Sequence, residues 1–241
     1  RLIYGKITGY GARDLRVGYD AIIQAETGFM YMNGSAEGPP TKMPVALVDV
    51  LAAHQLKQAL LLAIIHRMQT GKGSEVSVSL SDSAISALVN QASNWLNAGH
   101  IPQRIGSEHP NIAPYGTVFS TKDGAEIILA VGTDKQFASL CQILGIAITD
   151  TFATNHARVL CRSELNQLLS EKISHWEAEK LLAILHQKNV PVGKVNQMPE
   201  VFAQSGVENI MLQDEEMRGV RQFVAQSDIF EKQEMKKPPV F

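Results

Sequence analysis

The residues of this 241-residue sequence that could carry chemistry are two cysteines, seven histidines and acidic side chains near predicted helix starts. Cys141 and Cys161 lie far apart and match neither a metal-binding nor a redox spacing, so we interpret both as buried thiols of a reducing compartment. The histidines form no His-x-x-x-His or His-Glu-x-x-His pattern, which argues against a zinc site. The sequence also lacks a Gly-x-x-x-x-Gly-Lys-Ser/Thr phosphate loop and a Gly-x-Ser-x-Gly nucleophile elbow.

One acidic residue, Asp49, stands at the start of the longest helix that the sequence predicts. Residues 49–68 are apolar on nearly every side, a pattern typical of a buried helix, and Gly71 suits its left-handed end. From position alone, the simplest interpretation of Asp49 is that it caps this helix. A carboxylate in the same place could also act as a nucleophile, and the two roles are compatible.

Alternating strand and helix patterns surround this residue. The elements predicted in the first part are a strand at 2–8, helices at 19–29 and 49–68, a strand at 75–80 and a helix at 83–96. Asp82 would cap the last of these helices. This order of elements predicts an α/β fold with a parallel sheet covered by helices.

A segment rich in Pro and Gly, residues 97–114, separates this part from a second unit and is interpreted as a linker. The elements predicted beyond it are a strand at 126–131, helices at about 134–144, 162–173 and 177–188, and a short strand at 190–195. The tail after residue 205 is mixed and polar.

The overall charge excludes some classes of partner. The net charge of −2 and the absence of a Lys/Arg run argue against nucleic acid and against an anionic membrane surface. The longest apolar run, residues 59–65, is far shorter than the roughly 20 residues that cross a bilayer. No signal-peptide pattern opens the sequence, so we expect a cytoplasmic protein.

Several motifs, in a fixed order, resemble those of the family III CoA-transferases. They are Ile7-Thr-Gly-Tyr-Gly11, Gly18-Tyr-Asp-Ala-Ile-Ile-Gln-Ala25, Gly38-Pro-Pro40, Val45-Ala-Leu-Val-Asp-Val50, Thr70-Gly-Lys-Gly73, Val76-Ser-Val-Ser-Leu-Ser-Asp-Ser83, His109-Pro-Asn-Ile-Ala-Pro-Tyr115 and Val190-Pro-Val-Gly193. The resemblance covers nearly all of residues 3–203, and its specificity comes from the order of the motifs rather than from any one of them.

The resemblance implies a Rossmann-like large domain with a parallel sheet and a smaller α/β domain. Residues 1–96 would form the C-terminal part of the large CoA-binding domain, whose N-terminal part we expect to be absent. Residues 97–114 would be the linker, 115–203 the small domain and 204–241 a segment returning towards the large domain. The resemblance also implies an interlocked, ring-shaped homodimer.

The same resemblance places Asp49 at the family's nucleophile. Its carboxylate would attack an acyl-CoA thioester and form a mixed anhydride, then an enzyme–CoA thioester that passes CoA to a carboxylic acid. We expect amides at the helix start to stabilise the ionised carboxylate. Coenzyme A would be a substrate, with no permanently bound cofactor and no metal. The segment around residues 109–115 resembles the branch of the family that uses dicarboxylic acids.

Further site residues follow from the resemblance, each with a plainer alternative. Arg16 lies near a basic position that contacts CoA phosphate, but it could be a solvated arginine. Tyr19 would stack on or hydrogen-bond the substrate, and Asp20 would orient the acyl group or a water. The alternative is that Tyr19 is a packed aromatic and Asp20 an ordinary charge of a first helical turn.

Three more candidates, His109, Asn111 and Tyr115, lie in the segment rich in Pro and Gly. They could belong to a loop that closes over the active site and keeps water from the anhydride. They could equally form a rigid turn between two domains.

Two other functions remain open. An α-methylacyl-CoA racemase of the same fold would carry histidine in an Ala-Gly-His-Asp pattern, where this sequence has Val17-Gly18-Tyr19-Asp20. Without that histidine one arm of the proton shuttle is missing, which favours CoA transfer. A truncated family member that binds a partner without catalysis is the second alternative.

Overall fold

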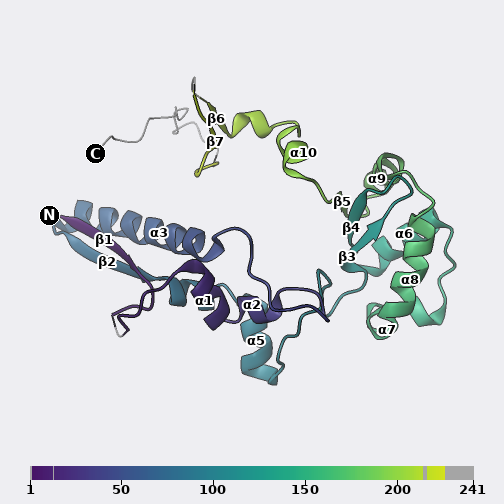
Figure 1. Ribbon diagram of the computed structural model, residues 1–241, viewed down its shortest axis with the longest axis horizontal. Coiled ribbons are helices and arrows are strands. Elements are labelled where there is room, and N and C mark those ends of the chain that lie inside the picture. Colours follow the sequence, from purple (N-terminus) through teal and green to yellow (C-terminus); the bar gives the residue numbers. More distant parts are fainter. Residues whose placement is uncertain (1, 13, 214–215, 226–241) are drawn as a thin grey trace.

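The computed structural model describes residues 2–12, 14–213 and 216–225, which form two groups of elements with separate hydrophobic cores (Figure 1). The first group contains β1 (Ile3–Thr8), α1 (Asp20–Glu26), α2 (Phe29–Met32), α3 (Leu47–Thr70), β2 (Ser74–Ser79), α4 (Leu80–Ser86) and α5 (Val89–Ala98). Strands β1 and β2 pair in parallel along their whole length, from Ile3 opposite Ser74 to Thr8 opposite Ser79. The predicted parallel sheet is confirmed for these two strands, and α3 packs against both of them.

Helix α3 is longer than predicted and much less covered. It buries Val48, Ala52 and Ala63 and ends, as expected, at Gly71 in the left-handed conformation with φ 69°. The prediction of burial on nearly every side is wrong, since Leu62 and Met68 are 67% and 79% exposed. The reason is that β1, β2, α1 and α4 all pack against one part of its surface. By length and composition α3 could cross a membrane, a weak criterion that apolar helices of other kinds also meet.

Two predicted helix caps are also wrong. Ala46 occupies the capping position of α3 without a side-chain hydrogen bond, and Asp49 lies in the first turn. Ser79, rather than Asp82, caps α4, because its hydroxyl accepts a hydrogen bond from the Asp82 N–H at 3.0 Å. In both cases the helix begins two or three residues earlier than the apolar pattern indicates.

Two helices predicted as continuous are interrupted. The predicted helix at 19–29 becomes α1 and α2, which are separated at Gly28 with φ 89°. The predicted helix at 83–96 becomes α4 and α5, with Val89 at φ 39° where α5 begins. A positive φ lies outside the right-handed helical region, so a continuous helix cannot run through Gly28 or from α4 through Val89 into α5.

The second group is an antiparallel sheet covered by helices. Its elements are β3 (Tyr115–Ser120), β4 (Glu126–Ala130), α6 (Asp134–Leu144), the 3₁₀ helix η1 (Asp150–Phe152), α7 (Asn155–Leu160), α8 (Arg162–Ile173), α9 (Ala178–Gln187) and β5 (Val192–Lys194). The strand order is β3–β4–β5. Helices α6 and α8 have the predicted bounds, whereas β3 and α7 were not predicted.

Between and after the two groups the chain is less regular. Residues 99–114 contain no helix or strand beyond one bridge between Ile105 and Ser107. The last described elements are α10 (Met198–Phe202), η2 (Val207–Asn209) and the hairpin of β6 (Met211–Gln213) and β7 (Arg218–Val220). Residues 226–241 of the predicted return segment lie outside the described residues. The division into a large domain, linker and small domain stays a prediction.

Candidate active site

The carboxylate of Asp49 is exposed and faces a pocket of about 400 Å³. The pocket is lined by Asp49, Val50, Ala53, His54, Lys57 and Gln222. Five of these residues come from α3, and Gln222 comes from the segment that follows β7. His54 looks like an ordinary surface residue in the sequence. The sequence predicts that residues 204–241 return towards the large domain, but it does not single out Gln222 as the residue beside α3.

The start of α1 is joined directly to the start of α3. Asp20 accepts a hydrogen bond at Oδ1 from the N–H of Val48 at 2.8 Å and another at Oδ2 from Nε2 of Gln24 at 2.7 Å. Gln24, which is fully buried, accepts in turn from the N–H of Met43 at 2.8 Å. Asp20 therefore lies beside the start of α3, and both of its carboxylate oxygens accept hydrogen bonds within the protein.

Two glycines allow this arrangement. A Cβ atom on Gly18 would lie 2.6 Å from the Cα of Gly9, a distance that real side chains do not tolerate. Gly9 directly follows β1, and its carbonyl oxygen accepts a hydrogen bond from Ser81 just after β2. The close approach therefore holds the residues before α1 at the carboxyl edge of the parallel strands, where α/β proteins usually bind ligands.

The environment of Asp49 favours the protonated carboxyl more than the sequence indicates. Burial of the group and the negative charge of Asp20 together raise the pKa of Asp49 above its usual range. Amides at the helix start are expected to stabilise the ionised form, which would lower the pKa of Asp49. The pKa is raised instead, so this expectation is wrong. One of those amides, the N–H of Val48, is already bonded to Asp20.

Tyr19 and Arg16 lie close to this site in sequence but differ in their surroundings. Tyr19 occupies the capping position of α1 and its side chain is 69% exposed, so it is not a packed aromatic. Arg16 forms ion pairs with Asp14 at 2.8 Å and Glu26 at 2.9 Å, and its guanidinium stacks over the ring of Tyr10. A phosphate group would have to compete with both carboxylates for Arg16.

His109, Asn111 and Tyr115 are close to one another and belong to the second group. The Nδ1 atom of His109 accepts a hydrogen bond from the Asn111 N–H at 3.1 Å, and its ring meets that of Tyr115 edge-on with centroids 5.2 Å apart. Arg162 of α8 donates to the carbonyl oxygen of His109 at 2.8 Å. Among the described residues, the hydrogen bonds of these three side chains do not reach α3.

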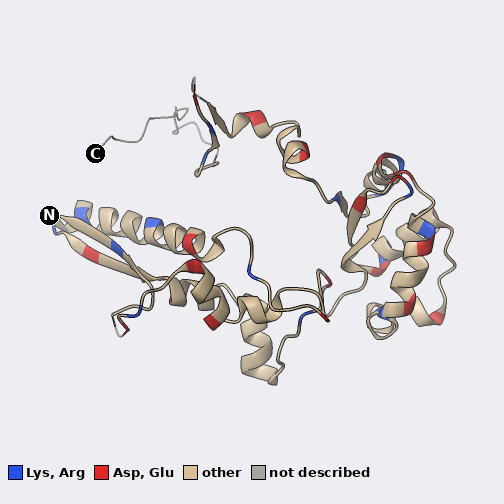
Figure 2. Ribbon diagram, viewed as in Figure 1, with Lys and Arg blue, Asp and Glu red and all other residues tan. Residues whose placement is uncertain are grey.

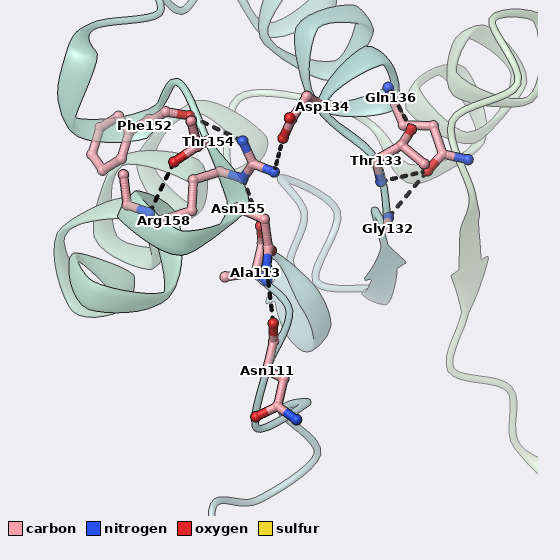
Figure 3. A network of polar contacts seen from close by, with 11 residues as sticks. Asn111, Ala113, Gly132, Thr133, Asp134, Gln136, Phe152, Thr154, Asn155 and Arg158 are labelled. Carbon is pink, nitrogen blue, oxygen red and sulfur yellow. Dashed lines mark hydrogen bonds and ion pairs between the residues drawn. The ribbon is translucent and has the colours of Figure 1, made fainter.

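The segment that carries these residues is firmly attached to α7 (Figure 3). The Asn155 side chain donates to the Asn111 carbonyl oxygen at 2.8 Å and accepts from the Ala113 N–H at 3.1 Å. Arg158, which is fully buried, donates to the carbonyl oxygen of Ala113 at 2.8 Å and to the carboxylate of Asp134 at 2.7 Å. These contacts favour the rigid-turn interpretation over a loop that opens and closes.

Side chains that could bind a metal ion do not cluster in the part of the chain that the structure describes. Among residues 2–12, 14–213 and 216–225, no group of three or more His, Cys, Asp or Glu side chains could hold a metal ion. Charged residues are few along α3 (Figure 2), and two of its three, Asp49 and Lys57, line this pocket. The site is thus a carboxylate at the edge of an α/β sheet.

Comparisons with known proteins identify the family. The sequence model of CoA-transferase family III matches residues 1–237. Succinate–glutarate CoA-transferase from Agrobacterium fabrum is 41% identical over 214 residues, which cover 86% of this chain and 53% of that protein. Human succinyl-CoA:glutarate CoA-transferase is 35% identical over 212 residues, which cover 86% of this chain and 48% of that protein.

A solved structure agrees as well. The crystal structure of a CAIB/BAIF family protein from Brucella suis superimposes with a TM-score of 0.82 and 38% identity, covering 94% of this chain and 62% of that one. The chain therefore belongs to CoA-transferase family III. It spans about half the length of the curated relatives that it matches. The predicted mixed α/β fold with a parallel sheet is confirmed in this form.

Proposed function

We propose that the full-length protein transfers CoA from an acyl-CoA thioester to a small carboxylic acid, with Asp49 as the nucleophile. The observation that carries this proposal is the exposed Asp49 carboxylate, which faces a pocket at the carboxyl edge of the parallel strands in a family III chain. The relatives named above, which are CoA-transferases of succinate and glutarate, favour a dicarboxylic acid as acceptor.

The proposed reaction proceeds through four steps. An Asp49 oxygen attacks the thioester carbonyl, forming an aspartyl–acyl anhydride and releasing CoA thiolate. The thiolate attacks the aspartyl carbonyl, which releases the donor acid and leaves an enzyme–CoA thioester. The acceptor carboxylate attacks this thioester, giving a second anhydride and CoA thiolate. The thiolate finally attacks the acceptor's acyl carbon, so that the new acyl-CoA leaves and the Asp49 carboxylate is regenerated.

The environment of Asp49 supports such a role. A raised pKa makes a carboxylate more basic, and a more basic oxygen attacks a carbonyl more readily while it remains ionised. Tyr19, which is exposed beside Asp20, is free to contact the acyl group, and Arg16 is proposed as a weaker contact to CoA phosphate. A racemase would need an acid–base pair, and Tyr19 is a poor replacement for the histidine of such enzymes.

We also propose that two chains associate as an interlocked homodimer. Support comes from the apolar side chains of α3 that the described residues leave uncovered, among them Leu61, Leu62 and Met68. A partner chain could cover these side chains and could bring its own segment 109–115 to the Asp49 pocket. A stable monomer of the full-length protein in a size measurement would contradict this arrangement.

The cytoplasm is the proposed location, without nucleic acid or membrane as a partner. Support comes from Cys141 and Cys161, which are both free thiols. Cys141 is buried as predicted, whereas the prediction of burial is wrong for Cys161, which is only partly buried. Burial raises the pKa of the Cys141 thiol to about 11, so that it stays protonated and unreactive at neutral pH.

The test is a screen of acyl-CoA donors against small carboxylic acids with the full-length protein, with products identified by mass spectrometry. The wild type should form a new acyl-CoA and a hydroxylamine-sensitive adduct at Asp49, and Asp49→Ala should form neither. Asp82→Ala, which removes an exposed acid from the first turn of α4, serves as the control. Full activity of Asp49→Ala would overturn the proposal.

Two further measurements address the alternatives. Deuterium incorporation at the α-carbon without CoA transfer would indicate a racemase. Failure of the full-length protein to bind CoA in a titration would favour a family member without catalytic activity.

A further inference from the structure

We propose that Asp20 and Gln24 are positioning residues for Asp49: their hydrogen bonds to the N–H groups of Val48 and Met43 fix both ends of the segment that leads into the nucleophile. The inference rests on the proposed function, because it assigns a role to two residues of the same site. Neither side chain needs to touch the substrate for this role.

The part of this segment just before Val48 is exposed and irregular. Residues 33–46 form no helix or strand, and Met43 and Val45 are 37% and 59% exposed. Two further backbone hydrogen bonds of residues 43–48 are local, from the Leu47 N–H to the Val45 carbonyl and from the Val50 N–H to the Ala46 carbonyl. Val48 is fully buried in the core of the first group, so packing already holds one end of the segment, and the two bonds to α1 add a polar attachment at each end.

The hydrogen bonds from Met43 through Gln24 to Asp20, together with the bond from Val48 to Asp20, form a relay. Each bond in this relay has a fixed donor and a fixed acceptor. The backbone N–H groups of Val48 and Met43 can only donate, and the ionised carboxylate of Asp20 can only accept. Gln24 is the one member that does both, donating from Nε2 to Asp20 and accepting at Oε1 from Met43. Because Gln24 is fully buried, water cannot easily replace either bond.

The relay also sets the charge next to Asp49. Asp20 on α1 contributes to the raised pKa of Asp49, after burial, which is the larger cause. The other titratable groups of the pocket are His54 and Lys57 on α3 itself. On the remaining packed elements, Asp82 of α4 and the Lys6–Glu75 ion pair of the two strands are not among the causes of this shift.

The polarity of the relay allows a test by exchange. Asp20→Asn puts two amide donors against each other, and Gln24→Glu puts two carboxylates against each other, so each change breaks the relay. The double variant Asp20→Asn/Gln24→Glu restores it, because the new amide on the first turn of α1 can donate to the new carboxylate one turn later, while both side chains still accept from the backbone. We use the full-length protein, with Asp82→Asn as a matched control in the first turn of α4.

Each single variant should lower kcat by about 10- to 100-fold with little change in KM, and the double variant should recover most of the loss. The rate of adduct formation should fall as the pH is lowered and Asp49 becomes protonated. In Asp20→Asn this fall should occur at lower pH, because the charge of Asp20 no longer raises the pKa of Asp49. A single variant with wild-type kcat, or a folded double variant no better than the worse single one, would overturn the proposal.

Amide hydrogen exchange keeps this test separate from that of the function. Exchange at Met43 and Val48 should be about tenfold faster or more in each single variant and should slow again in the double variant. If the wild type forms no adduct, the proposed function fails, and the exchange measurement still decides whether the relay holds the segment. Unchanged exchange in a folded Asp20→Asn protein would show that it does not.

Discussion

The Nε atom of Arg158 lies 2.8 Å from the carbonyl oxygen of Ala113, which is 45 residues earlier in the chain. Arg158 is fully buried, and its other two nitrogens donate to the carbonyl oxygen of Phe152 and to the carboxylate of Asp134 (Figure 3). A guanidinium keeps its charge in proteins, so its burial depends on these acceptors. The contact thus ties the residues before β3 to α7.

Replacing Arg158 with methionine should lower the free energy of unfolding by about 2–4 kcal/mol, because two buried carbonyl oxygens lose a charged donor. Urea unfolding measures this change. The control is Lys172→Met on α8, which breaks a half-exposed pair with Glu171 and should change stability by less than about 1 kcal/mol. Equal stability of the two variants would show that the Arg158 contacts are not structural.

The sequence predicts elements well where their stabilising partners are local. Helices α6 and α8 have the predicted bounds because each has a clear apolar stripe, and the start of α6 is also fixed by the capping box of Thr133 and Gln136. The break at Val89 depends on a backbone conformation that no residue pattern indicates. The exposure of α3 depends on which elements pack against it, and periodicity does not contain that information.

The candidate site also combines features that the local sequence indicates with features that depend on distant residues. Asp49 is found from sequence because it precedes a long apolar helix within an ordered set of family motifs. The partnership of Asp20 with Val48 could not be found, since 28 residues separate them and the bond is made to a backbone group. Gln24 gives a weak signal, one helical turn after Asp20, but nothing indicates that Met43 would be its other partner.

Asp49→Asn should abolish the hydroxylamine-sensitive adduct without loss of stability at neutral pH. The pKa of Asp49 is raised in the folded chain, so the folded state binds the proton more tightly than the unfolded state does. For such an acid, stability falls as pH rises through its two pKa values, and asparagine avoids this loss. Thermal unfolding should be measured for both proteins at about pH 4 and about pH 8. The melting temperature of the variant relative to that of the wild type should be higher at about pH 8 than at about pH 4. A variant clearly less stable than the wild type at the higher pH would contradict this.

Gly18→Ala should damage both the fold and the site. The added methyl group would lie 2.6 Å from the Cα of Gly9, and backbone on both sides leaves little room to adjust. We expect a loss of about 1–3 kcal/mol in unfolding free energy and a lower rate of adduct formation, since Tyr19 and Asp20 directly follow. Gly132→Ala is the control, because its Cβ would meet nothing closer than 3.9 Å. A Gly18→Ala protein as stable as Gly132→Ala would show that the approach of the two loops is not tight in solution.

Lys57 provides the last prediction, which concerns the acid that the pocket accepts. Its ammonium lies 5.4 Å from the ring centroid of Phe223 and forms no ion pair with any described residue, about two helical turns after Asp49 in the same pocket. Lys57 lines the same pocket as Asp49, so its cation can attract the second carboxylate of an acid bound there. Lys57→Met should therefore raise KM for a dicarboxylic acid by about tenfold, the loss expected for one charge-assisted hydrogen bond, and leave KM for a monocarboxylic acid of equal length unchanged.

Two variants serve as controls for this prediction. Lys57→Arg should keep the difference in KM between the dicarboxylic and the monocarboxylic acid, and Arg67→Met at the other end of α3 should change neither KM. An equal rise for both acids in Lys57→Met would show that Lys57 does not contact the distal carboxylate.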